Sequence, residues 1–109
     1  MKRISVIAPI YNEKENIELL VEKIKTTLKD RFTSYEIILV DDGSTDGSTE
    51  LIKEIASNNS HIKDYHFTKN NGQTAALSAG FKACTGDIVV TMDSDLQTDP
   101  EDIYLMLPY

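Results

Sequence analysis

Hydrophobic and polar residues follow two different patterns along the chain. Four short runs rich in β-branched residues predict strands, at residues 4–10, 35–40, 62–67 and 87–92. The segments between these runs predict helices. In the first two segments the apolar residues recur at the spacing of one helix face, namely Ile17, Leu20, Val21, Ile24 and Leu28, then Leu51, Ile52, Ile55 and Ala56. The third segment, residues 73–84, is rich in small residues, so we expect a helix packed closely on a sheet.

The alternation of strands and helices predicts an α/β fold with a mostly parallel sheet, because parallel neighbours need a long return connection that a helix supplies. Residues 37–40 and 88–90 are nearly continuous apolar runs, which predicts burial on both faces by helices on both sides. In open sheets of this kind, ligands bind at the carboxyl ends of the strands. The strand ends are therefore the place to look for a site.

The length and the net charge of the chain limit the number of domains and the kinds of partner that we expect. The 109 residues predict one domain, 1–109. Eleven basic and 18 acidic residues give a net charge of −7, which argues against a nucleic-acid partner and against binding to an anionic membrane. The single cysteine, Cys84, cannot form an internal disulfide, and the N-terminal apolar run is too short for a signal peptide or a membrane span. We therefore expect a cytoplasmic location.

Polar residues follow three of the predicted strands. They occupy residues 11–13 after the first strand, residues 41–47 after the second and residues 93–97 after the fourth. Taken singly, each could be an ordinary turn or a helix cap. Together they place several carboxylates at one edge of the sheet, where they would repel one another unless a cation lay between them.

The last of these segments predicts a metal site. In an extended segment the side chains of Asp93 and Asp95 point to the same face, so both carboxylates can reach one ion, with the Gln97 amide as a further ligand. Oxygen ligands of this kind suit Mg²⁺ or Mn²⁺, which complete their shell with water and substrate phosphates. A diphosphate is the expected guest.

Other metal and phosphate motifs fail on their spacing. The segments beginning at Asp42 and Asp93 resemble calcium loops but carry Lys53 and Tyr104 where the twelfth residue should be glutamate. No GxGxxG follows the first strand, and no GxxxxGK[ST] occurs. His61 and His66 flank the third strand without an obvious carboxylate or thiol partner nearby in sequence, so we do not expect a zinc site.

Four motifs together resemble the N-terminal half of the family 2 glycosyltransferases, inverting enzymes of the Rossmann-like GT-A fold that use nucleotide-activated sugars. The motifs are IAPIYNE at 7–13, VDDGSTD at 40–46, NGQTAA at 71–76 and MDSDLQ at 92–97. The last motif, followed by DPE at 99–101, is most similar to the polyprenyl-phosphate branch, which includes the dolichol-phosphate mannosyltransferase-like enzymes.

The resemblance implies a role for each matching residue. Asp93 and Asp95 would be catalytic through the metal that they hold with Gln97. The UDP- or GDP-sugar donor would be bound by Pro9, Tyr11, Asn12, Glu13, Asp41, Asp42, Ser44, Asn71, Gly72 and Asp93. The acceptor would be a lipid phosphate or a glycan.

The resemblance also implies that the fold is truncated. The acceptor half, the carboxylate that serves as base against hydroxyl acceptors, and any membrane helices would lie beyond residue 109, so contact with the cytoplasmic face of a membrane would come only through those segments. We expect this chain to bind donor nucleotide weakly and not to turn over.

Three other functions remain open from the residues. A phospho-receiver domain is also doubly wound, but it carries its acidic pair after the first strand and a Lys-Pro that is absent here. A non-catalytic nucleotide-binding or interaction module is compatible with a truncated fold. A metal-dependent nucleotidyltransferase would need a glycine-rich basic loop after the first strand.

Overall fold

The computed structural model describes residues 3–29, 31–32 and 34–92, and these form an alternating series of strands and helices. The strands are β1 (Arg3–Ile10), β2 (Ser34–Asp41), β3 (Ile62–His66) and β4 (Ile88–Thr91). The helices are α1 (Lys14–Lys29), α2 (Ser48–Ser57) and α3 (Gln73–Ala83). Each strand and helix predicted from the sequence is confirmed, with slightly different bounds. Residues 93–109, which include the motif segment at 93–97, lie outside the described residues.

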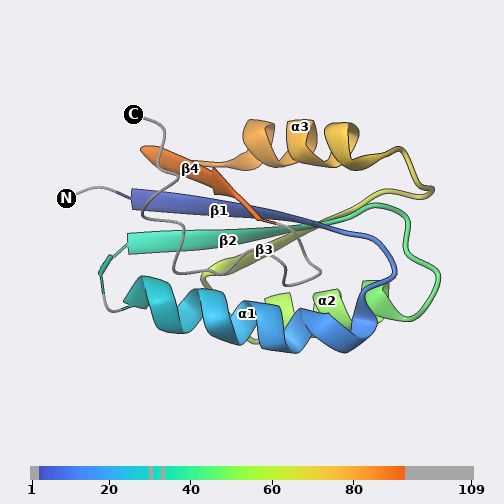
Figure 1. The fold of residues 1–109 in the computed structure, drawn as a ribbon, viewed down its shortest axis with the longest axis horizontal. Coiled ribbons are helices and arrows are strands. Elements are labelled where there is room, and N and C mark those ends of the chain that lie inside the picture. Colours follow the sequence, from blue (N-terminus) through green and yellow to red (C-terminus); the bar gives the residue numbers. More distant parts are fainter. Residues whose placement is uncertain (1–2, 30, 33, 93–109) are drawn as a thin grey trace.

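The strands form a parallel sheet in the order β3-β2-β1-β4. α1 and α2 cover one face and α3 covers the other, so the predicted arrangement of helices on both faces is confirmed (Figure 1). The chain moves outward from β1 through β2 to β3 and then returns to the opposite side of β1 for β4. The order of the strands therefore reverses between β1 and β4, which is where open α/β sheets bind ligands.

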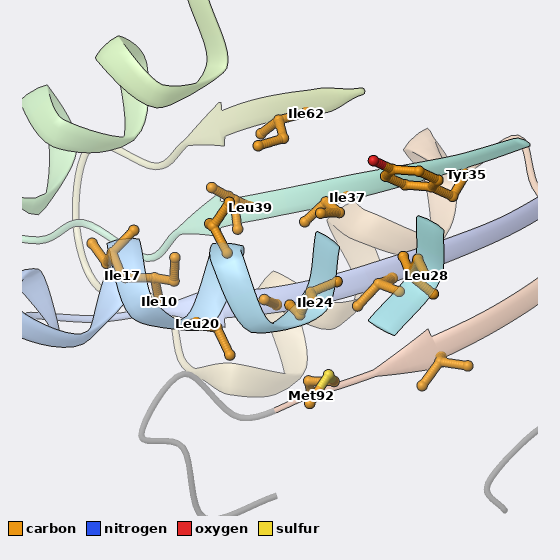
Figure 2. Packing of buried hydrophobic residues seen from close by; sticks show 14 of the residues in the cluster. Ile10, Ile17, Leu20, Ile24, Leu28, Tyr35, Ile37, Leu39, Ile62 and Met92 are labelled. Atoms are coloured by element: carbon orange, nitrogen blue, oxygen red, sulfur yellow. The ribbon is translucent and has the colours of Figure 1, made fainter. Parts of the chain in front are cut away.

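The larger core lies between the sheet and the two helices α1 and α2. The apolar face of α1 meets alternate residues of β1 and β2, including Ile10, Ile37 and Leu39 (Figure 2). Because successive side chains of a strand point to opposite faces, Ile7, Ile38 and Val40 lie on the other side, where they contact Ala76 of α3. Both faces of the two central strands are therefore buried, as their continuous apolar runs predict.

α3 approaches β1 closely through its small residues. Ala76 and Gly80 are the buried residues of this helix. A Cβ at Gly80 would lie 2.4 Å from Cγ2 of Ile7. The prediction that the small residues of this segment allow close packing on the sheet is therefore confirmed.

We expect the Gly80→Ala substitution to lower the free energy of unfolding by about 1–2 kcal/mol, because the methyl group would force α3 or Ile7 to move. Alanine is the better helix former by about 1 kcal/mol, so the clash must outweigh that gain. Urea denaturation would measure the difference. Ser78→Ala, at an exposed position of the same helix, is the matched control and should be neutral or slightly stabilising. A Gly80→Ala variant more stable than the parent would contradict the close contact.

A buried carboxylate with two partly exposed cations lies toward the opposite end of the sheet, where the strands begin. The carboxylate of Glu36 accepts hydrogen bonds from Ser5 Oγ at 2.6 Å and from the Thr85 backbone N–H at 2.6 Å. Its other oxygen lies 2.8 Å from Lys63 Nζ and 3.5 Å from the Arg3 guanidinium. Burial raises the pKa of Glu36, but these donors outweigh burial and lower that pKa from 4.5 to about 2.

Candidate functional site

The predicted nucleotide-binding residues that the structure describes lie at the carboxyl edge of the sheet, as the parallel arrangement requires. Tyr11, Asn12 and Glu13 follow β1, residues 41–44 end β2 and open the next loop, and residues 71–72 lead into α3. Pro9 lies near the same edge as the second-last residue of β1, where it is buried and pairs with Val40. The structure therefore brings three of the four sequence motifs to one edge.

Asn12 links the loop after β1 to the loop after β2. Its backbone N–H donates to Ser44 Oγ at 3.0 Å, and its side-chain oxygen accepts the Thr45 backbone N–H at 2.8 Å. Asn12 also has a φ of 51°, a conformation that asparagine tolerates better than most residues. The polar groups of Asn12 and Ser44 thus hold the two loops together.

Asp41, the first residue of the acidic pair, is buried and fully engaged with the protein. One carboxylate oxygen accepts the Ser44 backbone N–H at 2.9 Å. The other lies 2.9 Å from His66 Nδ1 and also accepts a hydrogen bond from the Thr49 hydroxyl. Burial raises the pKa of Asp41, but the contacts with His66, Thr49 and Ser44 outweigh burial and hold the pKa below its usual value.

Asp42, the second residue of the pair, organises the loop that precedes α3. Its carboxylate accepts the backbone N–H groups of Asn71 at 2.8 Å and Gly72 at 3.0 Å, and the side-chain amide of Asn70 at 3.0 Å. Only 3% of Asp42 is exposed. Both carboxylates of the pair therefore build the edge by binding protein groups.

Gly43 allows the loops after β2 and β3 to touch. Its φ is +76°, and a Cβ at this position would lie 2.3 Å from the carbonyl carbon of Lys69 and 2.5 Å from the Asn70 nitrogen. Those are backbone atoms, so a side chain at residue 43 would have to displace the loop that Asp42 holds. Glycine is required here by conformation and by space.

His66 has two carboxylate partners, so the interpretation that it has no carboxylate partner nearby in sequence is wrong, whereas the expectation about zinc is not contradicted. Nδ1 lies 2.9 Å from Asp41, and Nε2 lies 2.7 Å from Asp64. Asp41 is the residue that β2 pairs with His66 across the sheet, a contact that depends on strand register. Asp64 could have been recognised, because residues two apart on a strand share a face. His61 instead stacks on Tyr35, with ring centroids 4.5 Å apart.

The remaining predicted residues differ in the exposure and the hydrogen-bond partners of their side chains. Tyr11 is 46% exposed, and the side chain of Asn71 is exposed and donates to the Lys69 carbonyl at 3.2 Å. The Glu13 carboxylate accepts the Asn16 side-chain amide at 2.8 Å, at the start of α1. Tyr11, Asn12 and Asn71 are thus the exposed residues of the predicted set that the structure describes, and the Asn12 side-chain oxygen is already bound by Thr45.

The predicted metal ligands Asp93, Asp95 and Gln97 lie outside the described residues. The described part of the chain ends at Met92, just after β4, where the Met92 backbone N–H donates to the Ile7 carbonyl of β1 at 2.9 Å. Within residues 3–29, 31–32 and 34–92, no group of three or more histidine, cysteine or acidic side chains could hold a metal ion. The same residues contain no helix that is both long enough and apolar enough to cross a membrane.

The sequence profile of the family described as glycosyl transferase family 2 matches residues 5–109. The chain belongs to this family, and the resemblance predicted from the four motifs is confirmed.

Relatives of known activity point to one branch of the family. The undecaprenyl-phosphate 4-deoxy-4-formamido-L-arabinose transferase of Yersinia pestis is 43% identical over 104 residues, which cover 94% of this chain and 32% of the relative. The transferase of the same description from Pectobacterium carotovorum is 43% identical over 110 aligned positions, which cover 100% of this chain and 34% of the relative. The chain therefore spans about a third of the length of these relatives, which belong to the polyprenyl-phosphate branch.

Solved structures share the fold. A mannosyltransferase from Pyrobaculum calidifontis, in complex with GDP-Man and Mn²⁺, aligns with a TM-score of 0.76 and 30% identity over 86% of this chain and 28% of that protein. S. aureus TarS in complex with UDP aligns with a TM-score of 0.73 and 28% identity over 85% of this chain and 27% of that one. The four-stranded parallel sheet is thus a partial GT-A-like fold, as predicted.

Proposed function

We propose that this chain is the donor-binding part of an inverting glycosyltransferase that transfers a sugar from a UDP- or GDP-sugar to a polyprenyl phosphate. One observation carries the proposal, namely that three motifs of the family meet at the carboxyl edge of the sheet, next to the reversal of strand order. The identity to undecaprenyl-phosphate transferases supports the lipid-phosphate acceptor over a glycan. Membership of the family argues against a receiver domain and a nucleotidyltransferase.

The residues at this edge divide into two roles. Tyr11 and Asn71 are exposed and available to the nucleotide, the tyrosine ring as a surface on which a base can stack. Asp41, Asp42 and Ser44 support the site indirectly, because their polar groups hold in place the loops that carry the exposed residues. Gly72 belongs to both roles. Its N–H binds Asp42, and the family resemblance implies that it lines the nucleotide pocket near the base or ribose.

Asp93, Asp95 and Gln97 would hold Mg²⁺ or Mn²⁺, and their carboxylate and amide oxygens are the donors that such ions prefer. When bound, the ion offsets negative charge on the departing nucleoside diphosphate. The Mn²⁺ in the structurally similar mannosyltransferase supports this assignment.

The chemical nature of the acceptor determines whether sugar transfer needs a general base. A lipid phosphate is already ionised at neutral pH, so its attack on the anomeric carbon needs no strong base, whereas a hydroxyl acceptor needs one. Membrane contact, at the cytoplasmic face, would come from parts of the protein beyond these 109 residues. We therefore expect donor binding without sugar transfer from this chain alone.

Calorimetric titration of UDP and GDP, with and without Mn²⁺, tests the proposal on the parent chain and on Asp95→Ala. We expect Mn²⁺ to tighten the binding of one nucleotide by about 10-fold or more, and Asp95→Ala to remove that gain, because a charged ligand of the ion is lost. Glu54→Ala, which removes an exposed acidic residue from α2, is the control for net charge and should bind like the parent.

Each contrary result bears on a different part of the proposal. Nucleotide binding that is equal with and without Mn²⁺ would overturn the metal assignment. No binding of either nucleotide to a folded chain would overturn its role as the donor-binding part.

A further inference from the structure

A continuous series of hydrogen bonds crosses the carboxyl edge of the sheet from β3 to the loop after β1. Asp64 contacts His66 at 2.7 Å, and His66 contacts Asp41 at 2.9 Å. Asp41 accepts the Ser44 N–H at 2.9 Å, and Ser44 Oγ accepts the Asn12 N–H at 3.0 Å. The series therefore joins β3 and β2 to the two loops that carry the family motifs.

The two carboxylates that hold His66 differ in their access to water. The Asp41 side chain is 1% exposed, whereas the Asp64 side chain is 29% exposed. A buried carboxylate that loses a donor pays a desolvation cost, whereas a partly exposed one can turn to water. A neutral His66 is therefore expected to keep its proton on Nδ1, toward Asp41, with Asp64 fixing the orientation of the ring.

We propose that His66 is a positioning residue of the nucleotide site, which orients Asp41 and, through Asp41, the loop formed by Ser44 and Asn12. The inference rests on the proposed function, since it assigns His66 to the donor site. His66 itself need not touch the nucleotide. Its Nδ1–H supplies one of the donors that let Asp41 remain ionised in a buried position.

The groups that contact His66 come from two strands, Asp41 from β2 and Asp64 from β3. The Thr49 hydroxyl of α2 binds Asp41 on the same carboxylate oxygen that His66 contacts. Glu50 and Lys53 of α2 are exposed, and within the described part of the chain neither forms an ion pair with His66. Among the described residues, the side chains that bind the two ring nitrogens are therefore those of Asp41 and Asp64.

Two substitutions at His66 distinguish the role of Nδ1 from the role of Nε2. Asparagine carries its amide at the level of Nδ1, so His66→Asn keeps a donor for Asp41. Glutamine carries its amide one bond further out, near Nε2, so His66→Gln serves Asp64 instead. We expect His66→Asn to bind the better nucleotide within about 3-fold of the parent and His66→Gln to bind it about 10-fold more weakly, because a hydrogen bond to a buried charge is lost.

Nuclear magnetic resonance of the ligand-free chain provides a readout that packing alone would not change. Nitrogen chemical shifts of the ring show which of its two nitrogens carries a proton, and we expect Nδ1, which faces the buried Asp41, to carry one. The backbone amide signals of Ser44 and Thr45 should stay in place in His66→Asn and move in His66→Gln.

A His66 ring protonated only on Nε2, or equal effects of the two substitutions on the Ser44 and Thr45 signals, would overturn the inference. These signals need no nucleotide, so they decide the role of His66 even if the parent chain binds neither UDP nor GDP. In that case the proposed function fails separately. Equal nucleotide affinities of the two variants, with a parent that binds, would also overturn the inference.

Discussion

Replacing Gly43 with alanine is expected to lower the free energy of unfolding by about 3 kcal/mol or more. The φ of +76° costs an alanine about 1 kcal/mol, and its Cβ would lie 2.3 Å from the Lys69 backbone. The loop at residues 69–72 must then move, which weakens the hydrogen bonds that Asp42 accepts, each contributing about 1 kcal/mol. Chemical denaturation would measure the loss, and nucleotide affinity should fall with it.

Gly47 offers the matched control for that substitution. Its φ is +97°, but a Cβ there would meet only the Lys14 side chain, whose nearest atom is 3.1 Å away and which can move aside. Gly47→Ala should therefore show the conformational cost alone, about 1 kcal/mol. Equal losses for the two variants would mean that the contact between Gly43 and the backbone of residues 69–70 contributes nothing.

Acid should destabilise the chain through Glu36. Its folded pKa of about 2 lies below the ordinary value of 4.5, so its stabilising contribution is complete above pH 4.5 and is lost as the pH falls toward 2. The shift corresponds to about 3 kcal/mol. The pKa of Asp41 is also lowered, which adds a loss in the same direction.

The Glu36→Gln variant isolates this contribution, because glutamine does not titrate. We expect it to be less stable than the parent at pH 6, with a difference that shrinks by about 3 kcal/mol on acidification to pH 2. Denaturation curves across this pH range measure the difference, and the exposed Glu54→Gln is the control that should show little change. A gap between parent and Glu36→Gln that stays constant with pH would contradict the lowered pKa.

The fold was predictable because its signals are local. Runs of β-branched residues and the spacing of apolar residues on α1 fix the elements, and their alternation fixes a parallel sheet. The close approach of α3 also follows from its small residues. Each of these features can be seen within one segment of the chain.

The partners of the polar residues could be predicted only in part. Asp41 and Asp42 read as a nucleotide-binding pair, yet their carboxylates bind protein groups more than 20 residues away, such as His66 and Gly72. In the sequence Glu36 is an acidic residue beside an apolar run, with no visible partner. The register of the sheet brings Ser5 and Thr85 to its carboxylate. Strand register and loop contacts are tertiary properties that no local pattern contains.

The position of β1 inside the sheet has a consequence for synthesis. Ile4 pairs with Ile88, so one side of β1 finds its partner only after a further 84 residues have been made. At ribosomal rates of about 5–20 residues per second, that interval is roughly 4–17 s. During this time the unpaired N–H and C=O groups along that side of β1 form an exposed edge to which another nascent chain can add. The order of the strands thus makes protection by chaperones most useful in the interval between the synthesis of β1 and the synthesis of β4.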